Sequence, residues 1–470
     1  MNTRELVLDT LLTLEREGDY SHRLIKSVLD KYDYLEARDK AFIKRLTEGT
    51  LERQLELDYY LDSFSSLPVR KMKPLIRCLL RMSVYQLLYM DAVPDSAACN
   101  EACKLAAKRG FGSLKGFVNG VLRRIAGQKN SLPMPDQGRE PVRYLSVKYS
   151  MPEWIVEMWL DEYGKNITET LLEGLLEIHP VSVRFSTLMS GGERDRLCGD
   201  MRKSGMEMTP SPYLPYLYLT GGYTENPASL SAFSMGKCTV QDVSSALAVE
   251  AAGIKEGDFV VDVCAAPGGK SLLAAEKAGS GRVLARDVSE EKISITEENI
   301  SRMGAENIEV QIFDGTRTDE ALLGRADVLL LDVPCSGLGV MGKKRDIKYR
   351  IARENLGELQ KLQRQIAAAS AGYVKKGGTL LYSTCTIRRE ENEDMVRYIV
   401  QELGFEPVPL EAVLPKNVIT IKNHLKDRMK EAGKEPGAGL TEEEAGACIQ
   451  LLPGYMKADG FFIARFRRPE

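Results

Sequence analysis

The second half of the chain contains short runs of β-branched and aromatic residues that alternate with stretches of helical periodicity. The runs that we expect to be strands are residues 259–263, 282–285, 308–313, 328–331, 379–382 and 461–466. Strands that alternate with helices form βαβ units, whose strands are parallel. The pattern therefore predicts a doubly wound α/β sheet, in which a ligand lies outside the carboxyl ends of the strands.

The first half of the chain has a different pattern. Over residues 1–127 the apolar residues recur three and four positions apart, as in 24–35 and 75–87, which predicts an all-helical domain. Turn-forming residues then collect in 127–138 and mark a linker. Residues 141–234 mix helical and strand-like segments. We therefore predict a multidomain chain with an all-α domain at 1–127, a small α+β subdomain at 141–234 and an α/β domain at 235–470.

Length and composition define the class of protein. A chain of 470 residues exceeds one ordinary core, and at about 150 residues a domain it should form roughly three domains. Hydrophobic residues make up 43% and charged residues 28%, as in folded globular chains. No apolar run approaches the roughly 18 residues of a membrane span, and residues 1–17 read as an amphipathic helix and not as a signal peptide. We therefore expect a cytoplasmic protein without a membrane segment.

The net charge of −3 is unevenly distributed. Residues 1–127 contain 21 Lys and Arg against 17 Asp and Glu, so this segment carries +4 and the remainder −7. A basic module joined to a mildly acidic body is consistent with a protein that binds nucleic acid with one part and acts on it with another.

A loop of small residues follows the first predicted strand of the α/β half. Its residues are Cys264, Ala265, Ala266, Pro267, Gly268, Gly269 and Lys270. Small residues let the backbone approach a ligand closely, and the N-terminus of the helix that we expect next offers free amides to an anion. The loop alone is weak evidence, because a tight turn between strand and helix needs glycine for conformational reasons.

Carboxylates follow the next two predicted strands. Asp287 follows the second strand, where a nucleotide site places an acceptor for ribose hydroxyls; capping of the following helix is its alternative role. Asp314 follows the third strand and suits the exocyclic amine of an adenine. The three strand ends together predict an adenosine-type ligand.

The fourth and fifth strands each lead to a cysteine. The two segments read Asp332, Val333, Pro334, Cys335, Ser336, Gly337 and Ser383, Thr384, Cys385, Thr386. Because parallel strands end at the same edge of a sheet, we expect both thiols and Asp332 at one rim. Carbon 5 of a cytosine is a poor nucleophile, but a thiolate that adds to carbon 6 makes it reactive toward a methyl donor. One thiol could attack and the other assist, while Asp332 hydrogen-bonds the base.

Other roles for these cysteines stay open at this point. A free cysteine is most often a small buried hydrophobic residue. A metal site needs three or four ligands at suitable spacing, and since His22, His179 and His424 lie outside the strand-end segments we expect no metal. Nine cysteines in so long a chain are too sparse for a disulfide framework.

The three blocks around Gly268, Cys335 and Cys385 resemble the Sun-type (NSUN) family of RNA cytosine-C5 methyltransferases. Glu391 and Asn392 follow in the same order as in that family. The resemblance implies a Rossmann-like class I methyltransferase fold. It also implies that the 264–270 loop, Asp287, Asp314 and Asp332 bind S-adenosylmethionine, that Cys385 is the nucleophile and that Cys335 releases the product.

The helical segment resembles NusB, an RNA-binding fold of antitermination. The matching segments are 51–61, 80–88, 100–102 and 117–124. A NusB-like domain joined to this catalytic domain is similar to small-subunit ribosomal RNA methyltransferases of bacteria, which implies 16S ribosomal RNA as partner and a monomeric enzyme. The segment after Cys335 lacks the proline that the family often has there, and we expect its Lys343, Lys344 and Arg345 to contact phosphates.

Two other functions are compatible with the sequence. The same chemistry could act on transfer RNA or large-subunit RNA, since only the NusB-like front end favours the small subunit. A protein of another class, a non-catalytic RNA-binding assembly factor, would not need the two thiols. The polar segment 417–447 has no role that the sequence defines, and we expect it to be a surface insertion.

Overall fold

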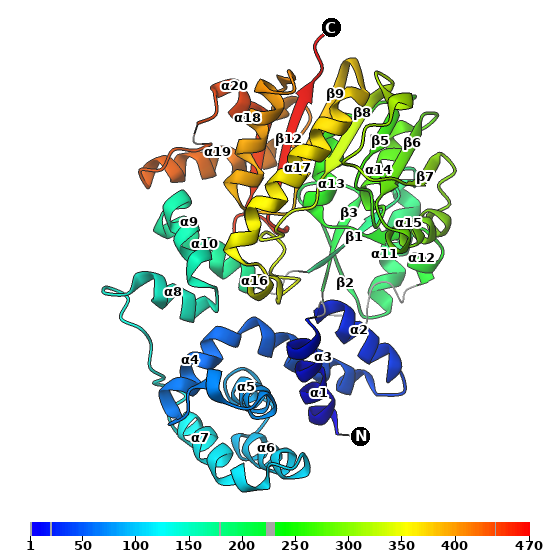
Figure 1. Ribbon diagram of the computed structural model, residues 1–470. Helices are drawn as coiled ribbons and strands as arrows, with labels where there is room; N and C mark the ends of the chain where they lie inside the picture. Colours follow the sequence, from blue (N-terminus) through cyan, green and yellow to red (C-terminus); the bar gives the residue numbers. More distant parts are fainter. Residues whose placement is uncertain (1, 19–20, 178–179, 222–230, 438) are drawn as a thin grey trace. The chain divides into compact units, whose positions relative to one another are not determined.

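The computed structural model describes residues 2–18, 21–177, 180–221, 231–437 and 439–470. Its backbone packing divides the chain into two compact units. Figure 1 shows the elements of both, with colours that follow the residue number. The helical unit consists of Met1–Glu162 and Lys343–Arg350, and the catalytic unit consists of Tyr163–Gly342 and Ile351–Glu470. In this division residues 141–162 belong with the helices before them. The three sequence-based domains stay a prediction.

The helical unit is built from amphipathic helices around one apolar core. Its helices are α1 (Thr3–Glu17), α2 (Ser21–Lys31), α3 (Ala37–Glu52), α4 (Gln54–Phe64), α5 (Pro74–Tyr89), α6 (Asp95–Lys108), α7 (Lys115–Gly127), α8 (Pro141–Tyr149), α9 (Glu153–Tyr163) and α16 (Ile347–Arg350). The core forms from buried residues of α1, α3, α4, α5, α6 and α7, as the three- and four-residue spacing predicts. Helix α8 packs against α4.

A segment from the second half of the chain, Lys343–Arg350, packs as part of the helical unit. Asp346 accepts hydrogen bonds from the Ser21 backbone amide at 3.1 Å and from its hydroxyl at 2.5 Å. Arg345 is ion-paired with Glu52 at 3.3 Å, and Lys348 donates to the Glu52 carbonyl at 2.8 Å. Arg345 is therefore ion-paired within the protein, and the phosphate contacts expected of residues 343–345 stay a prediction.

The catalytic unit begins with α10 (Lys165–Leu176) and a small antiparallel sheet. Its strands are β1 (Val181–Phe185), β2 (Glu207–Pro210), β3 (Leu217–Gly221) and β4 (Cys238–Val240), in the order β2-β3-β1-β4. Helix α11 (Gly191–Lys203) packs against β2, and the short α12 (Ser231–Ser234) lies against β4. The strand expected at Val181 is present, so this region mixes helices and strands as predicted.

The larger sheet has the order β10-β12-β9-β8-β5-β6-β7, with β11 beside β12. Its strands are β5 (Phe259–Asp262), β6 (Arg282–Asp287), β7 (Ile308–Ile312), β8 (Ala326–Asp332), β9 (Val374–Thr384), β10 (Glu406–Pro407), β11 (Cys448–Leu451) and β12 (Phe461–Arg467). Five central strands are parallel, whereas β12 runs antiparallel to β9. The sheet is thus Rossmann-like and mixed, and the expectation of a wholly parallel sheet is wrong for its last strand.

Helices cover both faces of this sheet (Figure 1). On one face, α13 (Val243–Ala252) and α14 (Gly269–Ala278) pack on alternate strand residues such as Val260. On the other, α17 (Leu356–Ser370) and α18 (Glu393–Gln401) pack on the intervening residues such as Val261. Helix α15 (Glu290–Met303) contacts β6 and β7. Strands buried on both faces explain the nearly continuous apolar runs of the sequence.

The polar segment near the C-terminus is more ordered than its composition indicates. It forms α19 (Lys416–Glu431) and α20 (Glu442–Ala447). Val418, Leu425 and Met429 are buried, and their spacing of seven and four residues places them on one helical face. Within the described ranges, the structure has no helix with the length and apolarity needed to cross a bilayer.

Candidate active site

The two cysteines predicted at the sheet edge lie side by side. Cys335 follows β8 and Cys385 follows β9, and these strands are parallel neighbours. Their sulfur atoms are 3.2 Å apart, and both residues are half-buried. A pair of thiols at this distance can share a proton, which neither could do as an isolated core residue.

Asp332 at the end of β8 is held by two side chains. Its Oδ2 is 2.7 Å from Lys270 Nζ, and its Oδ1 accepts a 2.7 Å hydrogen bond from the Ser383 hydroxyl. The side chain is 27% exposed, so it remains reachable from solvent. These contacts fix the carboxylate beside the thiols in an orientation that can receive hydrogen bonds from a base.

The electrostatic environment distinguishes the two thiols. The hydrogen bond to Cys385, followed by burial, raises the pKa of Cys335 well above its ordinary value. Burial lowers the pKa of Lys270, but Asp332, Asp262 and Cys385 outweigh it, so that the pKa of Lys270 is raised overall. Cys335 therefore stays protonated, while Cys385 interacts electrostatically with the Lys270 cation.

The small-residue loop forms a tight turn between β5 and α14. Gly268 has φ +93° and donates to the Ala265 carbonyl at 2.7 Å. A Cβ on Gly268 would meet Thr296 Cγ2 at 2.9 Å, so both conformation and space require glycine there. The peptide groups of Ala265 and Ala266 are fixed by β6, through the Arg286 carbonyl at 2.8 Å and Asp287 Oδ2 at 3.2 Å.

Asp287 and Asp314 lie at the ends of successive strands but in different settings. Asp287 is buried, and its Oδ1 also accepts from the Val288 amide at 2.8 Å and from Lys292 Nζ at 3.0 Å. Asp314 is more open and accepts from the amide and the hydroxyl of Thr316. These hydrogen bonds lower the pKa of Asp314. Both are carboxylate acceptors at the edge of the sheet where the parallel strands end.

Asp262, the last residue of β5, is a buried carboxylate beside the 264–270 loop that our sequence reasoning missed. It is fully buried, and its Oδ2 accepts a 2.6 Å hydrogen bond from the Ser271 hydroxyl. Its Oδ1 has no hydrogen-bond partner among the described residues. A carboxylate inside the apolar run 259–263 was the available signal, since buried charges are rare without a partner.

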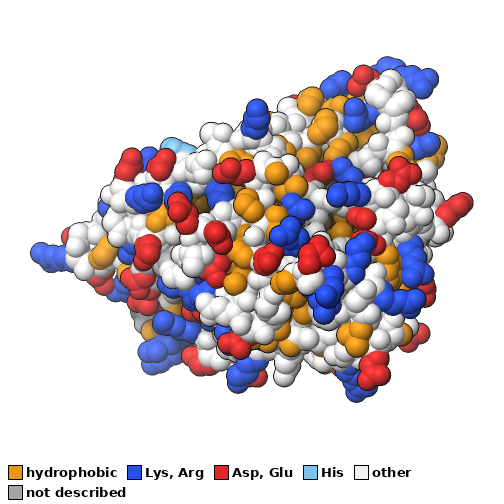
Figure 2. All heavy atoms as spheres, turned by 90° about the horizontal axis from the view of Figure 1, so that it is seen from above, with side chains coloured by type: hydrophobic (Ala, Val, Ile, Leu, Met, Phe, Trp, Pro, Cys, Tyr) orange, Lys and Arg blue, Asp and Glu red, His pale blue; other side chains and the backbone are white. Residues whose placement is uncertain are grey.

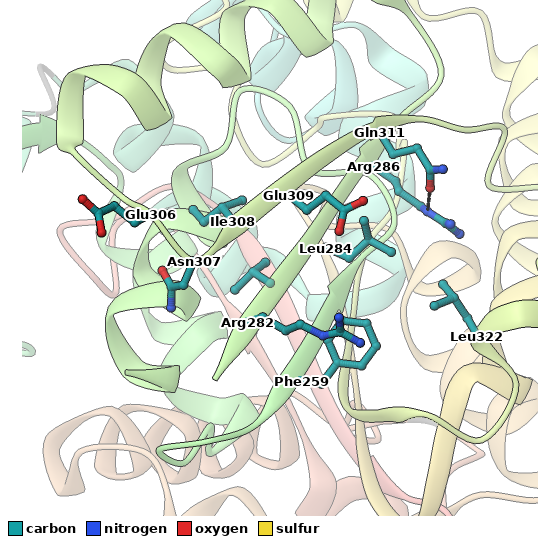
Figure 3. Close-up of a pocket in the computed structure, with 11 residues that line it drawn as sticks. Phe259, Arg282, Leu284, Arg286, Glu306, Asn307, Ile308, Glu309, Gln311 and Leu322 are labelled. Atoms are coloured by element: carbon teal, nitrogen blue, oxygen red, sulfur yellow. Dashed lines mark hydrogen bonds between the residues drawn. The ribbon is translucent and has the colours of Figure 1, made fainter. Parts of the chain in front are cut away.

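A separate pocket lies on the flank of the sheet. It has a volume of about 370 Å³ and is lined by residues of β5, β6 and β7. Figure 3 shows Arg282 against the ring of Phe259, and Arg286 bonded to Gln311. None of the predicted site residues is among those that line it, so its size is not evidence for the catalytic centre. Within the described ranges, no cluster of His, Cys, Asp and Glu could hold a metal ion; His179 lies outside them.

Comparisons with known proteins match both parts of the chain. The model of the 16S rRNA methyltransferase RsmB/F family matches residues 250–467, and that of the NusB family matches residues 1–127. A probable ribosomal RNA small subunit methyltransferase B of Bacillus subtilis is 34% identical over 99% of both chains. One of Synechocystis is 30% identical over 100% of both. The chain belongs to the RsmB/F family.

A solved structure is also similar in fold. A methyltransferase homologue from Pyrococcus horikoshii superposes with a TM-score of 0.57 at 24% identity, covering 70% of this chain and 99% of that one. The protein is thus an S-adenosylmethionine-dependent methyltransferase with a NusB-type domain, which confirms the sequence-based resemblance. The glycine cradle at Gly268, the carboxylates at three strand ends and the unsatisfied oxygen of Asp262 fit a ligand with a ribose, an adenine and an amino group.

Asp262 should make the stability of the ligand-free protein depend on pH. Burial raises the pKa of Asp262 to about 7, so the folded state keeps a proton that the unfolded state loses near the ordinary value. The free energy of unfolding therefore falls as the pH rises from the ordinary pKa of an aspartate to the raised pKa of Asp262, by at most about 4 kcal/mol. The melting temperature of the Asp262→Asn variant should fall less between pH 5 and pH 8 than that of the unmodified protein. The exposed Glu256→Gln variant is the control, and equal falls in all three proteins would contradict the assignment.

Proposed function

We propose that the protein transfers a methyl group to carbon 5 of a specific cytosine in 16S ribosomal RNA through a covalent cysteine–cytosine intermediate. It acts as a monomer in the cytoplasm and needs no metal. The observation that carries the proposal is the pair of sulfur atoms 3.2 Å apart beside the Asp332–Lys270 pair. The names of the full-length relatives support small-subunit RNA as substrate.

The methyl donor would occupy the edge of β5, β6 and β7. The 264–270 loop, Asp287, Asp314 and Asp332 are the residues that would hold S-adenosylmethionine. When bound, it supplies an electrophilic methyl group carried by a sulfonium. Asp287 is suited to the ribose hydroxyls and Asp314 to the adenine, because both are carboxylates that accept hydrogen bonds.

Attack on the base is assigned to Cys385. Its sulfur, as a thiolate stabilised by the nearby Lys270 cation, forms a bond to carbon 6 of a cytosine that has been turned out of the RNA stack. Asp332 accepts a hydrogen bond from the exocyclic amine and stabilises the adduct. The electron pair of the former carbon 5–carbon 6 double bond then takes up the methyl group.

Release of the product is assigned to Cys335. Once Cys385 is a thioether, the interaction that chiefly raised the pKa of Cys335 is gone, so Cys335 can lose its proton to solvent and act as a base. It removes the proton from carbon 5, whose electron pair restores the carbon 5–carbon 6 double bond. The carbon 6–sulfur bond breaks, its electron pair returns to Cys385, and one proton has been released in the whole cycle.

The face of the molecule in Figure 2 shows Lys and Arg interspersed with Asp and Glu. Interspersed charges do not single out this face for phosphate binding. The RNA contacts are therefore assigned by chain region, to the NusB-type domain and the small antiparallel sheet, and not to a visible basic patch.

Mapping 5-methylcytosine in cells tests the proposed substrate. Ribosomal RNA from cells without this gene should lack one 5-methylcytosine of 16S rRNA, and the purified protein should restore it on that RNA with labelled S-adenosylmethionine. Loss of the mark from transfer RNA or 23S rRNA instead would overturn the substrate assignment. Failure to label any RNA with both cysteines intact would favour a non-catalytic assembly factor.

A further inference from the structure

The dipeptide Glu391-Asn392 lies beneath the two cysteines and has no role in the chemistry described so far. Both side chains are completely buried. A buried carboxylate costs free energy unless it is well hydrogen-bonded, so its partners indicate what it is for. The two residues precede α18 and contact different loops.

Glu391 holds the loop that contains Cys335. Its Oε2 accepts a 2.9 Å hydrogen bond from the backbone amide of Ser336 and a 2.8 Å hydrogen bond from Gln363 Nε2. Gln363 Nε2 also donates to the carbonyl of Pro334 at 2.9 Å. The residues on both sides of Cys335 are thus tied, directly or through Gln363, to one carboxylate.

Asn392 holds the loop that contains Cys385. Its Oδ1 accepts a 2.6 Å hydrogen bond from the Thr384 hydroxyl, and its Nδ2 donates to the Thr386 carbonyl at 3.2 Å. The residues on both sides of Cys385 are therefore bonded to one amide. A third donor–acceptor contact, between Asn392 Nδ2 and Gln450 Oε1 at 2.8 Å, fixes the orientation of that amide.

Two adjacent residues thus support two thiols that have separate tasks. We propose that Glu391 is a positioning residue for Cys335 in the release step and that Asn392 is a positioning residue for Cys385 in the attack step. This inference rests on the proposed function, because it assigns to each residue one of the two covalent steps. Loss of Glu391 contacts should leave the carbon 6–sulfur bond formed but slow to break, whereas loss of Asn392 contacts should slow its formation.

The test measures the covalent protein–RNA adduct and the methylated product in the same reaction. Glu391→Ala removes the acceptor for Ser336 and Gln363, and about tenfold slower release is expected from the misplaced thiol, so the ratio of adduct to product rises. Glu391→Gln keeps an oxygen acceptor and should restore most of the normal ratio. Asn392→Ala should form adduct about tenfold more slowly, with no rise in that ratio. Glu390→Ala, at the half-exposed neighbouring position, should behave like the unmodified protein.

Binding of S-adenosylmethionine and the melting temperature of each variant show whether it is folded. If Glu391→Ala does not fold, Gln363→Met carries the same expectation for the Cys335 loop. A merely structural role would lower the folded fraction and leave the ratio of adduct to product unchanged in Glu391→Ala and Gln363→Met, which would overturn the inference. The proposed function fails separately, if the unmodified protein and Cys335→Ala form neither product nor adduct.

Discussion

Replacement of Cys335 by alanine should stop the reaction at the covalent stage. Cys385 would still bond to carbon 6, and methyl transfer would still occur, but the base that removes the carbon 5 proton would be absent. Protein and RNA should therefore remain joined, and a band of the combined mass should survive denaturing electrophoresis. Multiple turnover should fall by at least roughly a hundredfold, as expected for a lost proton-transfer group.

The matched control for this variant is Cys103→Ala. Cys103 lies in α6 of the helical unit and donates only a weak hydrogen bond to the Lys115 carbonyl, so the variant should turn over normally and accumulate no adduct. A Cys335→Ala protein that releases product at the normal rate would show that another group removes the proton.

Replacement of Cys385 by alanine should abolish both the adduct and methylation. Without a sulfur bond at carbon 6, carbon 5 is too weakly nucleophilic to accept a methyl group, and removal of an enzyme nucleophile costs at least roughly a thousandfold in rate. Binding of S-adenosylmethionine should persist, because Cys385 lies after β9 and outside the loop and strand ends assigned to the donor.

The double variant with alanine at both positions separates the two roles. It should resemble Cys385→Ala and form no adduct, since the release step has nothing to act on. An adduct in Cys385→Ala that disappears only in the double variant would reverse the assignment and make Cys335 the attacking residue.

The sequence predicted the catalytic sheet well because its signals are local. Each strand is a short apolar run. Asp332 ends β8, Cys335 follows three residues later and Cys385 comes directly after β9, so that parallel pairing of β8 and β9 brings their positions to one edge. The antiparallel direction of β12 was not predictable in this way, because the run 461–466 carries the same composition as a parallel strand.

The supporting residues could not be assigned from local patterns. Gln363 is separated from Cys335 by 28 positions and Glu391 by 56, and their shared role depends on how α17 packs on the sheet. Helix α19 and the 343–350 segment were misread for a related reason, because both look polar in sequence and pack against distant parts of the chain. Asp262 was overlooked although its partner Ser271 is only nine positions away.

Residues 343–350 lie within the catalytic half of the sequence but pack with the helical unit. This limits how the protein can be cut into separate fragments. A catalytic fragment obtained by removing everything before Tyr163 would still carry Asp346 and Lys348, which are buried in the whole protein. They would lose Ser21 and the Glu52 carbonyl as partners and exchange these buried contacts for contacts with water. No single cut therefore yields two self-sufficient halves, and the helical unit is complete only when the chain has been synthesised as far as Arg350.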